Sequence, residues 1–191
     1  MLMNQLNRIS LIYKRRMKCY KERRKMIRLL TRNDAGHYVK LRLESLLESP
    51  TAFLKTYAEE VSTPQLEKEM GEKLAKEHFY TFGSFQDERL VGMITLQAEQ
   101  PLKIRHKGNL LAMYVEKGVR GNGLAKGLVQ VALDKAKELG LEQLQLTVVS
   151  TNKEAIALYE SLGFVTYAVE RNALKHKGQY WDEEHMALSL R

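Results

Sequence analysis

The sequence has one cysteine, no long apolar run and no internal repeat, and these absences exclude several classes of protein. Cys19 alone cannot form an internal disulfide framework or a metal site built from several cysteines. No stretch reaches the roughly 18 apolar residues that a helix needs to span a bilayer. The N-terminus carries scattered basic residues and no uninterrupted apolar segment, unlike a secretory signal. We therefore expect a protein of the reducing cytoplasm, with no membrane partner and no metal.

The charge of the chain is unevenly distributed. The 191 residues suffice for one domain with a substantial core, and their net charge is +8. The first 25 residues contain nine basic residues and one acid, Glu22, whereas the remainder contains 22 basic and 22 acidic residues. We therefore divide the chain into a basic extension, residues 1–25, and one domain, residues 26–191. Because the domain itself is formally neutral, its charge does not favour nucleic acid as a partner.

The basic extension has an amphipathic pattern. Its apolar residues recur at spacings of three, four and seven, which is typical of a short helix. They are Leu2, Leu6, Ile9, Tyr13 and Tyr20. A solvated extension, or a stretch upstream of a natural start at Met26, explains the pattern most simply. The alternatives are a helix on a membrane surface, an arm that binds nucleic acid or the ribosome, and a helix that packs on a partner subunit.

From Met26 onward the pattern predicts seven strands and four helices. The expected strands are residues 26–30, 79–86, 89–98, 110–115, 144–149, 164–172 and 179–190. The first expected helix follows the capping residues 31–34 and ends at Glu48, and the second opens at Ser62-Thr63-Pro64. The third covers 123–139, and the fourth runs from a cap at Asn152 to Gly163. The order is strand, two helices, three strands, helix, strand, helix and two strands.

A glycine-rich turn joins the buried strand that ends at Val115 to the next helix. Backbone N–H groups at a helix start have no carbonyl partner within the helix, and the helix dipole is positive there, so such a turn suits a phosphate. Gly121 and Gly123 allow an anion to approach the backbone, and Arg120 and Lys126 add positive charge. We call residues 120–125 the phosphate loop.

Two well-known phosphate motifs do not fit the phosphate loop. The Walker motif requires Gly-Lys followed by Ser or Thr, and the sequence contains no such triplet. The dinucleotide fingerprint requires Gly or Ala where Lys126 stands. On the glycines alone, a plain turn from strand to helix explains the residues about as well as a binding site does.

Two motifs together resemble a known family. The residues Arg120-Gly-Asn-Gly-Leu-Ala125 resemble the Arg/Gln-x-x-Gly-x-Gly/Ala loop of the GCN5-related N-acetyltransferase (GNAT) family, which binds the pyrophosphate of coenzyme A. Downstream, Asn152, Ala155 and Tyr159, followed by Gly163-Phe164, resemble the second hallmark of that family. Steps of three and four residues place the first three on one helix face. The resemblance is strongest over residues 110–165.

The resemblance implies a fold, a cofactor and a set of contacts. The fold would be a single α/β (α+β) domain with a central, mixed, mostly antiparallel sheet of about seven strands, flanked by about four helices, plus the basic helical extension. The cofactor would be acetyl-CoA. The residues that would bind it are Met113, Tyr114, Val115, Arg120, Gly121, Asn122, Gly123, Leu124, Ala125, Lys126, Asn152, Ala155 and Tyr159.

The same resemblance implies a reaction. The acetyl group would move directly from acetyl-CoA to a primary amine of a small molecule or peptide, and Tyr159 would protonate the departing thiolate. The general base stays open among Glu59, Glu60, Glu99 and Glu116, and the acidic run Asp182-Glu183-Glu184 is a candidate border for an amine pocket. The alternative function is a catalytically silent domain that binds or senses acyl-CoA. The sequence identifies neither the acceptor nor the oligomeric state, so a homodimer is left open.

Overall fold

The computed structural model describes residues 27–191, so the predicted extension lies outside the described residues. The strands are β1 (Ile27–Leu29), β2 (Phe79–Gln86), β3 (Arg89–Ala98), β4 (Lys107–Val115), β5 (Gln143–Val149), β6 (Val165–His176) and β7 (Gln179–Ser189). The α-helices are α2 (Ala35–Glu48), α3 (Tyr57–Val61), α4 (Leu66–Leu74), α5 (Leu124–Glu138) and α6 (Lys153–Glu160). Two 3₁₀ turns, Arg32–Asp34 and Lys117–Val119, precede α2 and α5.

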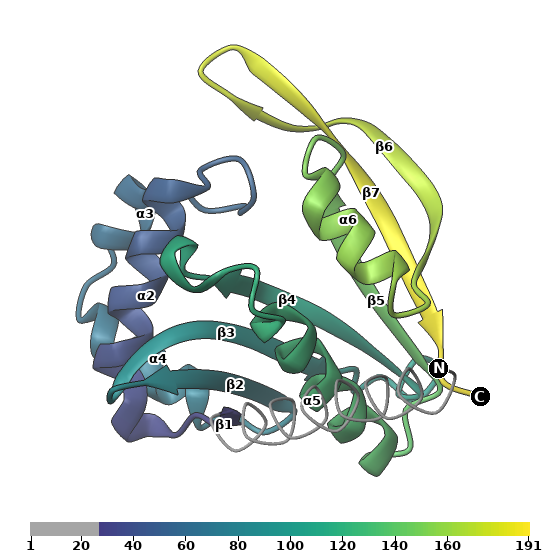
Figure 1. Cartoon of the computed structure of the whole chain (residues 1–191), viewed down its shortest axis with the longest axis horizontal. Coiled ribbons are helices and arrows are strands. Elements are labelled where there is room, and N and C mark those ends of the chain that lie inside the picture. The colour runs from purple at the N-terminus through teal and green to yellow at the C-terminus, as the bar shows by residue number, and fades with distance from the viewer. Residues whose placement is uncertain (1–26) are drawn as a thin grey trace, which may run out of the picture.

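The seven strands form one mixed sheet with the order β1-β2-β3-β4-β5-β7-β6. All neighbouring strands are antiparallel except β4 and β5. These two parallel strands pair only at their beginnings, where Lys107–Asn109 faces Gln143–Gln145. Beyond that point they separate, and Figure 1 shows the gap that opens between them. The sheet is therefore divided into two halves that are joined at one end.

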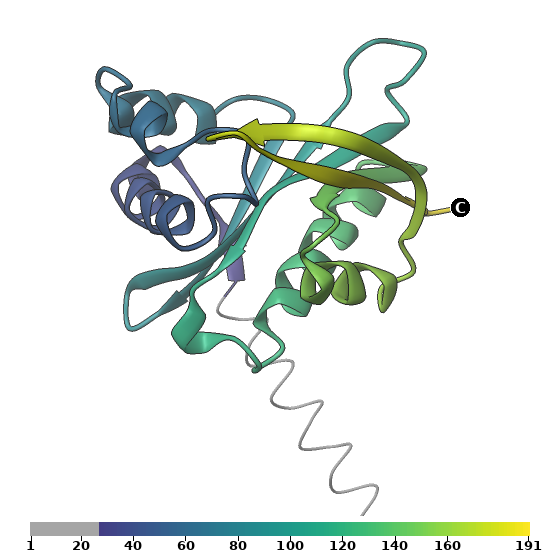
Figure 2. The same cartoon turned by 90° about the horizontal axis from the view of Figure 1, so that it is seen from above.

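Helices cover both faces of the sheet. Helices α2 and α4 pack on one face of β3 and β4 through Tyr38, Met70 and Met93, which are all buried. Helix α5 covers the opposite face, where Leu128 and Ala132 are fully buried, and α6 lies beside it against β5. Figure 2 shows the two helical layers on either side of the sheet. Burial of apolar side chains is the main favourable term in folding, so the first cluster holds α2 and α4 on the β1–β4 half, and the second joins both halves of the sheet.

The predicted fold is confirmed, with small differences in the elements. The seven strands occur in the expected order, and the hairpin turn at Asp87 and Glu88 has two residues with positive φ, as type I′ turns require. A fifth α-helix, α3, is additional. It is short, and the Glu59 side chain accepts a hydrogen bond of 2.7 Å from the Thr56 N–H, which satisfies a free donor at the helix start.

Several boundaries differ from the prediction. Helix α4 begins at Leu66, so Pro64 lies in the preceding turn and not in the first helical turn. Strand β4 begins three residues earlier than expected, at Lys107. Strand β6 continues to His176 because its residues pair with β7 beyond a register shift that follows Glu170. Within residues 27–191, no helix is both long and apolar enough to cross a membrane.

Candidate active site

The gap between β4 and β5 leaves backbone groups free to bind a ligand. From Leu110 onward β4 has no ladder partner on β5, and a bulge interrupts its pairing with β3. At this bulge Ala112 has φ = 52°, in the left-handed region that residues with a side chain rarely adopt. Bulges of this kind are common beside active sites, where they redirect the chain. The gap therefore offers the backbone groups of residues 110–114 that point away from β3, where β5 provides no ladder partner.

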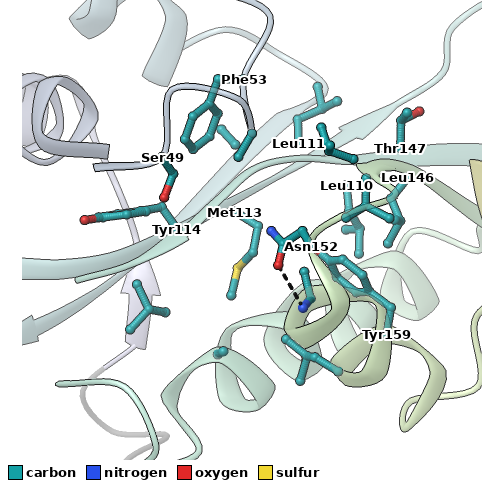
Figure 3. Close-up of a pocket in the computed structure, with 18 of the residues that line it drawn as sticks. Ser49, Phe53, Leu110, Leu111, Met113, Tyr114, Leu146, Thr147, Asn152 and Tyr159 are labelled. Atoms are coloured by element: carbon teal, nitrogen blue, oxygen red, sulfur yellow. Dashed lines mark hydrogen bonds between the residues drawn. The ribbon is translucent and has the colours of Figure 1, made fainter. Parts of the chain in front are cut away.

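A cleft of about 1180 Å³ occupies this gap. Its walls come from the end of α2 and the loop that follows, from β4, the phosphate loop, β5, α6 and the β7 strand. Figure 3 shows Met113 of β4 and Asn152 at the start of α6 on opposite sides of the gap, with Tyr159 farther along α6. The cleft thus joins residues as far apart in the sequence as Tyr38 and His185.

The phosphate loop lies at one end of the cleft. Gly121 and Gly123 have φ values of 77° and 75°, so both need the conformational freedom of glycine. A β-carbon at Gly121 would have no neighbouring atom within 4 Å, which leaves the backbone open on that side. Gly123 is the residue before α5, and no side chain caps the helix. The first N–H groups of α5 are therefore free to bind an anion.

Arg120 is held in place by protein groups. Its Nε donates to the Val115 carbonyl at 2.8 Å, and its Nη2 lies 2.5 Å from Glu48 Oε1. Glu48 Oε2 accepts a second hydrogen bond from the Tyr114 hydroxyl at 2.7 Å. Burial disfavours ionisation of Glu48, but the bonds from Tyr114 and Arg120 outweigh it and lower the pKa of that carboxyl. Arg120 thus ties the phosphate loop to the ends of β4 and α2.

The first turn and the last turn of α6 both face the cleft. Asn152 caps the helix, because its Oδ1 accepts from the Ala155 N–H at 3.2 Å, drawn as a dashed line in Figure 3. Tyr159 is 6% exposed, and its ring lies edge-on to Phe164 at 5.8 Å between centroids. Burial raises the pKa of Tyr159 to about 12, so the phenol keeps its proton near neutral pH.

Most of the predicted site residues line this one cleft. They are Met113, Tyr114, Val115, Arg120, Gly121, Gly123, Leu124, Ala125, Asn152, Ala155 and Tyr159. Asn122 and Lys126 are exposed and are not part of the lining. The Tyr114 side chain packs beneath α2 and α4, so only its main chain can reach the gap. The assignment of each residue to coenzyme A stays a prediction.

The candidate bases predicted from the sequence are distributed differently. Only Glu60 lines the cleft. Glu59 caps α3, Glu99 accepts a hydrogen bond from Asn109, and Glu116 accepts one from Arg89. Each of these three carboxylates therefore has another hydrogen-bond partner and lies outside the cleft lining.

The acidic run 182–184 is divided by the alternation of β7. Glu183 lines the cleft, whereas Asp182 binds Arg171 and Glu184 accepts from Thr166. Burial raises the pKa of Glu183, although nearby His185 opposes this shift. His185 also lines the cleft. Neither residue could be assigned by sequence position alone, because β7 meets β5 across more than 30 residues of chain.

A split sheet with an anion-binding helix start and a buried phenol defines a class of protein, one that binds an elongated ligand with a phosphate group. Residues 43–164 match the model of the acetyltransferase (GNAT) family. This match covers more than half of the chain, and the chain therefore belongs to the GNAT family of N-acetyltransferases, which use acetyl-CoA.

Curated relatives match parts of the chain. An uncharacterized N-acetyltransferase, YjgM, of Escherichia coli (strain K12) is 45% identical over 62 residues, which are 31% of this chain and 37% of that protein. A mycothiol acetyltransferase of Streptomyces scabiei is 35% identical over 47% of this chain and 28% of its own length. N-alpha-acetyltransferase 30 of Saccharomyces cerevisiae is 32% identical over 75 residues, which are 39% of this chain and 43% of that protein. The chain spans less than half the length of each of these relatives.

Solved structures share the fold over nearly the whole described chain. An acetyltransferase of the GNAT family from Streptococcus pneumoniae has a TM-score of 0.75 at 23% identity, covering 86% of this chain and 98% of that one. A putative acetyltransferase from Salmonella typhimurium, yncA, solved with its cofactor acetyl-CoA, has a TM-score of 0.74 at 20% identity, with 86% and 93% covered. These likenesses establish the fold alone.

Proposed function

We propose that this protein transfers an acetyl group from acetyl-CoA directly to a primary amine of a small molecule or peptide. The observation that carries the proposal is the separation of β4 from β5, which opens a cleft with an anion-binding helix start at one end and the buried Tyr159 on its wall. The family supplies the class of reaction. The chain's own residues then account for binding and for proton transfer.

The residues of the cleft fit acetyl-CoA in an extended conformation. The open backbone at Gly121 and the free N–H groups at the start of α5 would hold the pyrophosphate. The main chain of Met113, and the part of the Val115 main chain that Arg120 does not bind, would hydrogen-bond the pantetheine arm, with the small Ala155 leaving room on the facing wall. Bound acetyl-CoA supplies the activated acetyl thioester. N–H groups of the bulged strand β4 would stabilise the oxyanion that develops on the thioester.

Two side chains would move protons in this reaction. Within the described part of the chain the Tyr159 hydroxyl has no hydrogen-bond partner, so it is free to protonate a departing thiolate. Glu183 faces the same cleft, and its raised pKa makes its carboxylate a stronger base. We propose Glu183 as the group that accepts the proton of the attacking amine. It replaces Glu59, Glu99 and Glu116, whose side chains have other partners.

A glycine substitution tests the phosphate loop. Gly121→Ala adds a methyl group where the backbone must approach a phosphate, and we expect the acetyl-CoA affinity in calorimetry to fall about tenfold or more, because hydrogen bonds to a charged group contribute about 1.5–3 kcal/mol each. Gly140→Ala is the matched control, since Gly140 has a similar φ of 70° and equally open surroundings but lies outside the cleft. Both changes carry the same backbone strain, so equal affinities in the two variants would contradict the proposed site.

A second measurement separates the enzyme from a silent acyl-CoA-binding domain. Release of free coenzyme A is followed with a panel of amines that includes amino acids, polyamines, aminoglycosides and peptides. Turnover with any of them supports the transferase. Tight binding of acetyl-CoA without turnover on the whole panel would favour the sensing domain.

A further inference from the structure

A group of charged side chains on α2, α3, α4 and the loop before α3 lines the cleft opposite the β7 strand. We call Arg42, Lys55, Glu60 and Lys73 the basic wall, because three of the four are cations. Glu60 is shared by two of them: its Oε1 lies 3.5 Å from Arg42 Nε and its Oε2 lies 3.4 Å from Lys55 Nζ. Within residues 27–191 Lys73 makes no salt bridge, and Glu60 acts on its charge only from a greater distance. The wall therefore carries an excess of about two positive charges.

The basic wall has a buried end and an exposed end. The Arg42 and Glu60 side chains are only 12% and 5% exposed, and Arg42 Nη1 is buried without a hydrogen-bond acceptor. Lys55 and Lys73 are exposed. Partial desolvation, and then the charge of Arg42, lower the pKa of Lys73, although Glu60 opposes this shift. Buried polar groups are normally paired in folded proteins, so the unpaired Nη1 donor of Arg42 calls for a reason.

The guanidinium of Arg42 is held rigidly at this position. Its Cζ lies 4.5 Å from the centre of the Phe53 ring, which also lines the cleft and is shown in Figure 3. Stacking on an aromatic face and the bond to Glu60 orient the planar group before any ligand arrives. The wall is therefore a preorganised site for a planar anion such as a carboxylate.

The opposite side of the cleft has the opposite charge. Glu183 lies there on β7, and Glu170 of β6 is paired with His185 at 3.2 Å. Figure 1 shows α2 and α3 on one side of the molecule and the β6–β7 hairpin on the other. A ligand that spans the cleft thus meets cations at one end and a carboxylate at the other.

We propose that the acceptor is a small amine that also carries a carboxylate, such as a free amino acid, bound with its carboxylate on the basic wall and its amino group toward Glu183. This inference rests on the proposed acetyl transfer, and it selects one class among the possible acceptors. A polyamine or an aminoglycoside would meet repulsion from Lys55, Lys73 and Arg42. A peptide N-terminus would leave these cations without a nearby partner.

The test compares acceptors that differ only in the carboxylate. Several amino acids and their carboxamides are assayed with the full chain and acetyl-CoA, and kcat/KM is measured for each pair. We expect the free acids to be preferred by about tenfold or more, as a charged hydrogen-bonded contact predicts. Equal rates for acid and amide, or a preference for polyamines or peptides, would overturn the inference while leaving acetyl transfer intact.

Variants locate the preference on the basic wall. Lys73→Gln removes the unpaired cation and should reduce the ratio of acid to amide rates by about tenfold, whereas Lys73→Arg should preserve it. Lys68→Gln, on the same helix but outside the lining, is the control and should leave the ratio unchanged. If Lys73→Gln and Lys68→Gln give the same ratio as the original protein, the carboxylate does not bind here. Bound acetyl-CoA without turnover on any amine would instead contradict the proposed function, and this inference with it.

Discussion

Tyr159 lies in an environment that keeps its hydroxyl protonated. It is buried on α6, and burial raises the pKa of Tyr159 to about 12. A group that is to donate a proton to a thiolate must hold that proton at the working pH, and this environment ensures it. The ring itself is fixed by Phe164, so the hydroxyl has a defined position on the wall of the cleft.

Removal of that hydroxyl should affect the chemical step alone. We expect Tyr159→Phe to lower kcat by about 10²-fold, the usual contribution of general acid catalysis, with little change in acetyl-CoA affinity. The ring and its contact with Phe164 are retained, so thermal stability serves as the control. The rate of the original protein should also show no loss from tyrosine ionisation below about pH 11, because the folded pKa is about 12. An unchanged kcat in the variant would remove Tyr159 from the mechanism.

Arg120 and Lys126 were predicted to add positive charge at the phosphate loop, but the structure gives them other surroundings. Arg120 is bound to Glu48 and to the Val115 carbonyl, and Lys126 is exposed outside the cleft lining. We therefore propose that the attraction for a pyrophosphate would come mainly from the free N–H groups and the dipole of α5. Arg120 contributes by holding the loop against β4.

At the scale of elements, an ion pair fixes the start of the domain. Arg28 of β1 binds Asp34 just before α2 through two hydrogen bonds of 2.9 and 2.6 Å. Asp34 also accepts from the Thr31 N–H at 2.8 Å and is 6% exposed. The Arg28 guanidinium, followed by the Thr31 bonds, outweighs burial and holds the pKa of Asp34 well below its usual range. This network joins the edge of the sheet to the helix that carries Arg42 and Glu48.

Loss of the Asp34 charge should therefore reduce stability in a pH-dependent way. We expect Asp34→Asn to lower the free energy of unfolding by about 2 kcal/mol at pH 7, measured with urea. Because the folded pKa is depressed, the contribution is complete above about pH 4 and decreases as the pH falls toward the folded value, since the unfolded state then takes up the proton first. The difference in the free energy of unfolding between Asp34→Asn and the original protein should therefore decrease as the pH falls.

An exposed aspartate provides the control for this measurement. Asp87 lies in the β2–β3 turn, where asparagine tolerates its positive φ of 48°. We expect Asp87→Asn to change the free energy of unfolding by less than about 0.5 kcal/mol at any pH. A pH-independent loss in Asp34→Asn would show that the ion pair does not carry the effect.

At the scale of the whole molecule, acetyl-CoA should stabilise the domain as a unit. Its proposed site draws on both halves of the sheet, which are joined directly only where β4 and β5 begin. At a ligand concentration of 100 times Kd the gain is about 2.7 kcal/mol, or a rise in Tm of roughly 5–10 °C for a chain of this size. Differential scanning fluorimetry measures this shift.

The same experiment tests the proposed division of the chain. A chain that begins at Met26 lacks the basic extension, and we expect its Tm to rise with acetyl-CoA as much as that of the full chain, because the cleft lies within residues 27–191. Gly121→Ala in either chain should reduce the shift. A shift that requires residues 1–25 would place part of the site in the extension.

Local patterns predicted the elements well. The strands β2 and β3 occur at the residues predicted around the turn at Asp87 and Glu88, and the Asn152 cap binds Ala155, three positions away. Such signals lie within one element, so they can be read along the chain. The short helix α3 was missed because its five residues give too little of a period to distinguish it from a loop.

The sequence by itself determined the family, the strand order along the chain and the position of the phosphate loop. Each of these depends on residues close together, whose spacing sets the backbone conformation directly. Only the tertiary structure decided which carboxylates face the cleft, that Glu48 binds Arg120, and that Arg42 and Lys73 lie together with Glu60. These groups come from different elements, and their proximity depends on how α2 and α4 pack on the sheet and where β7 meets β5.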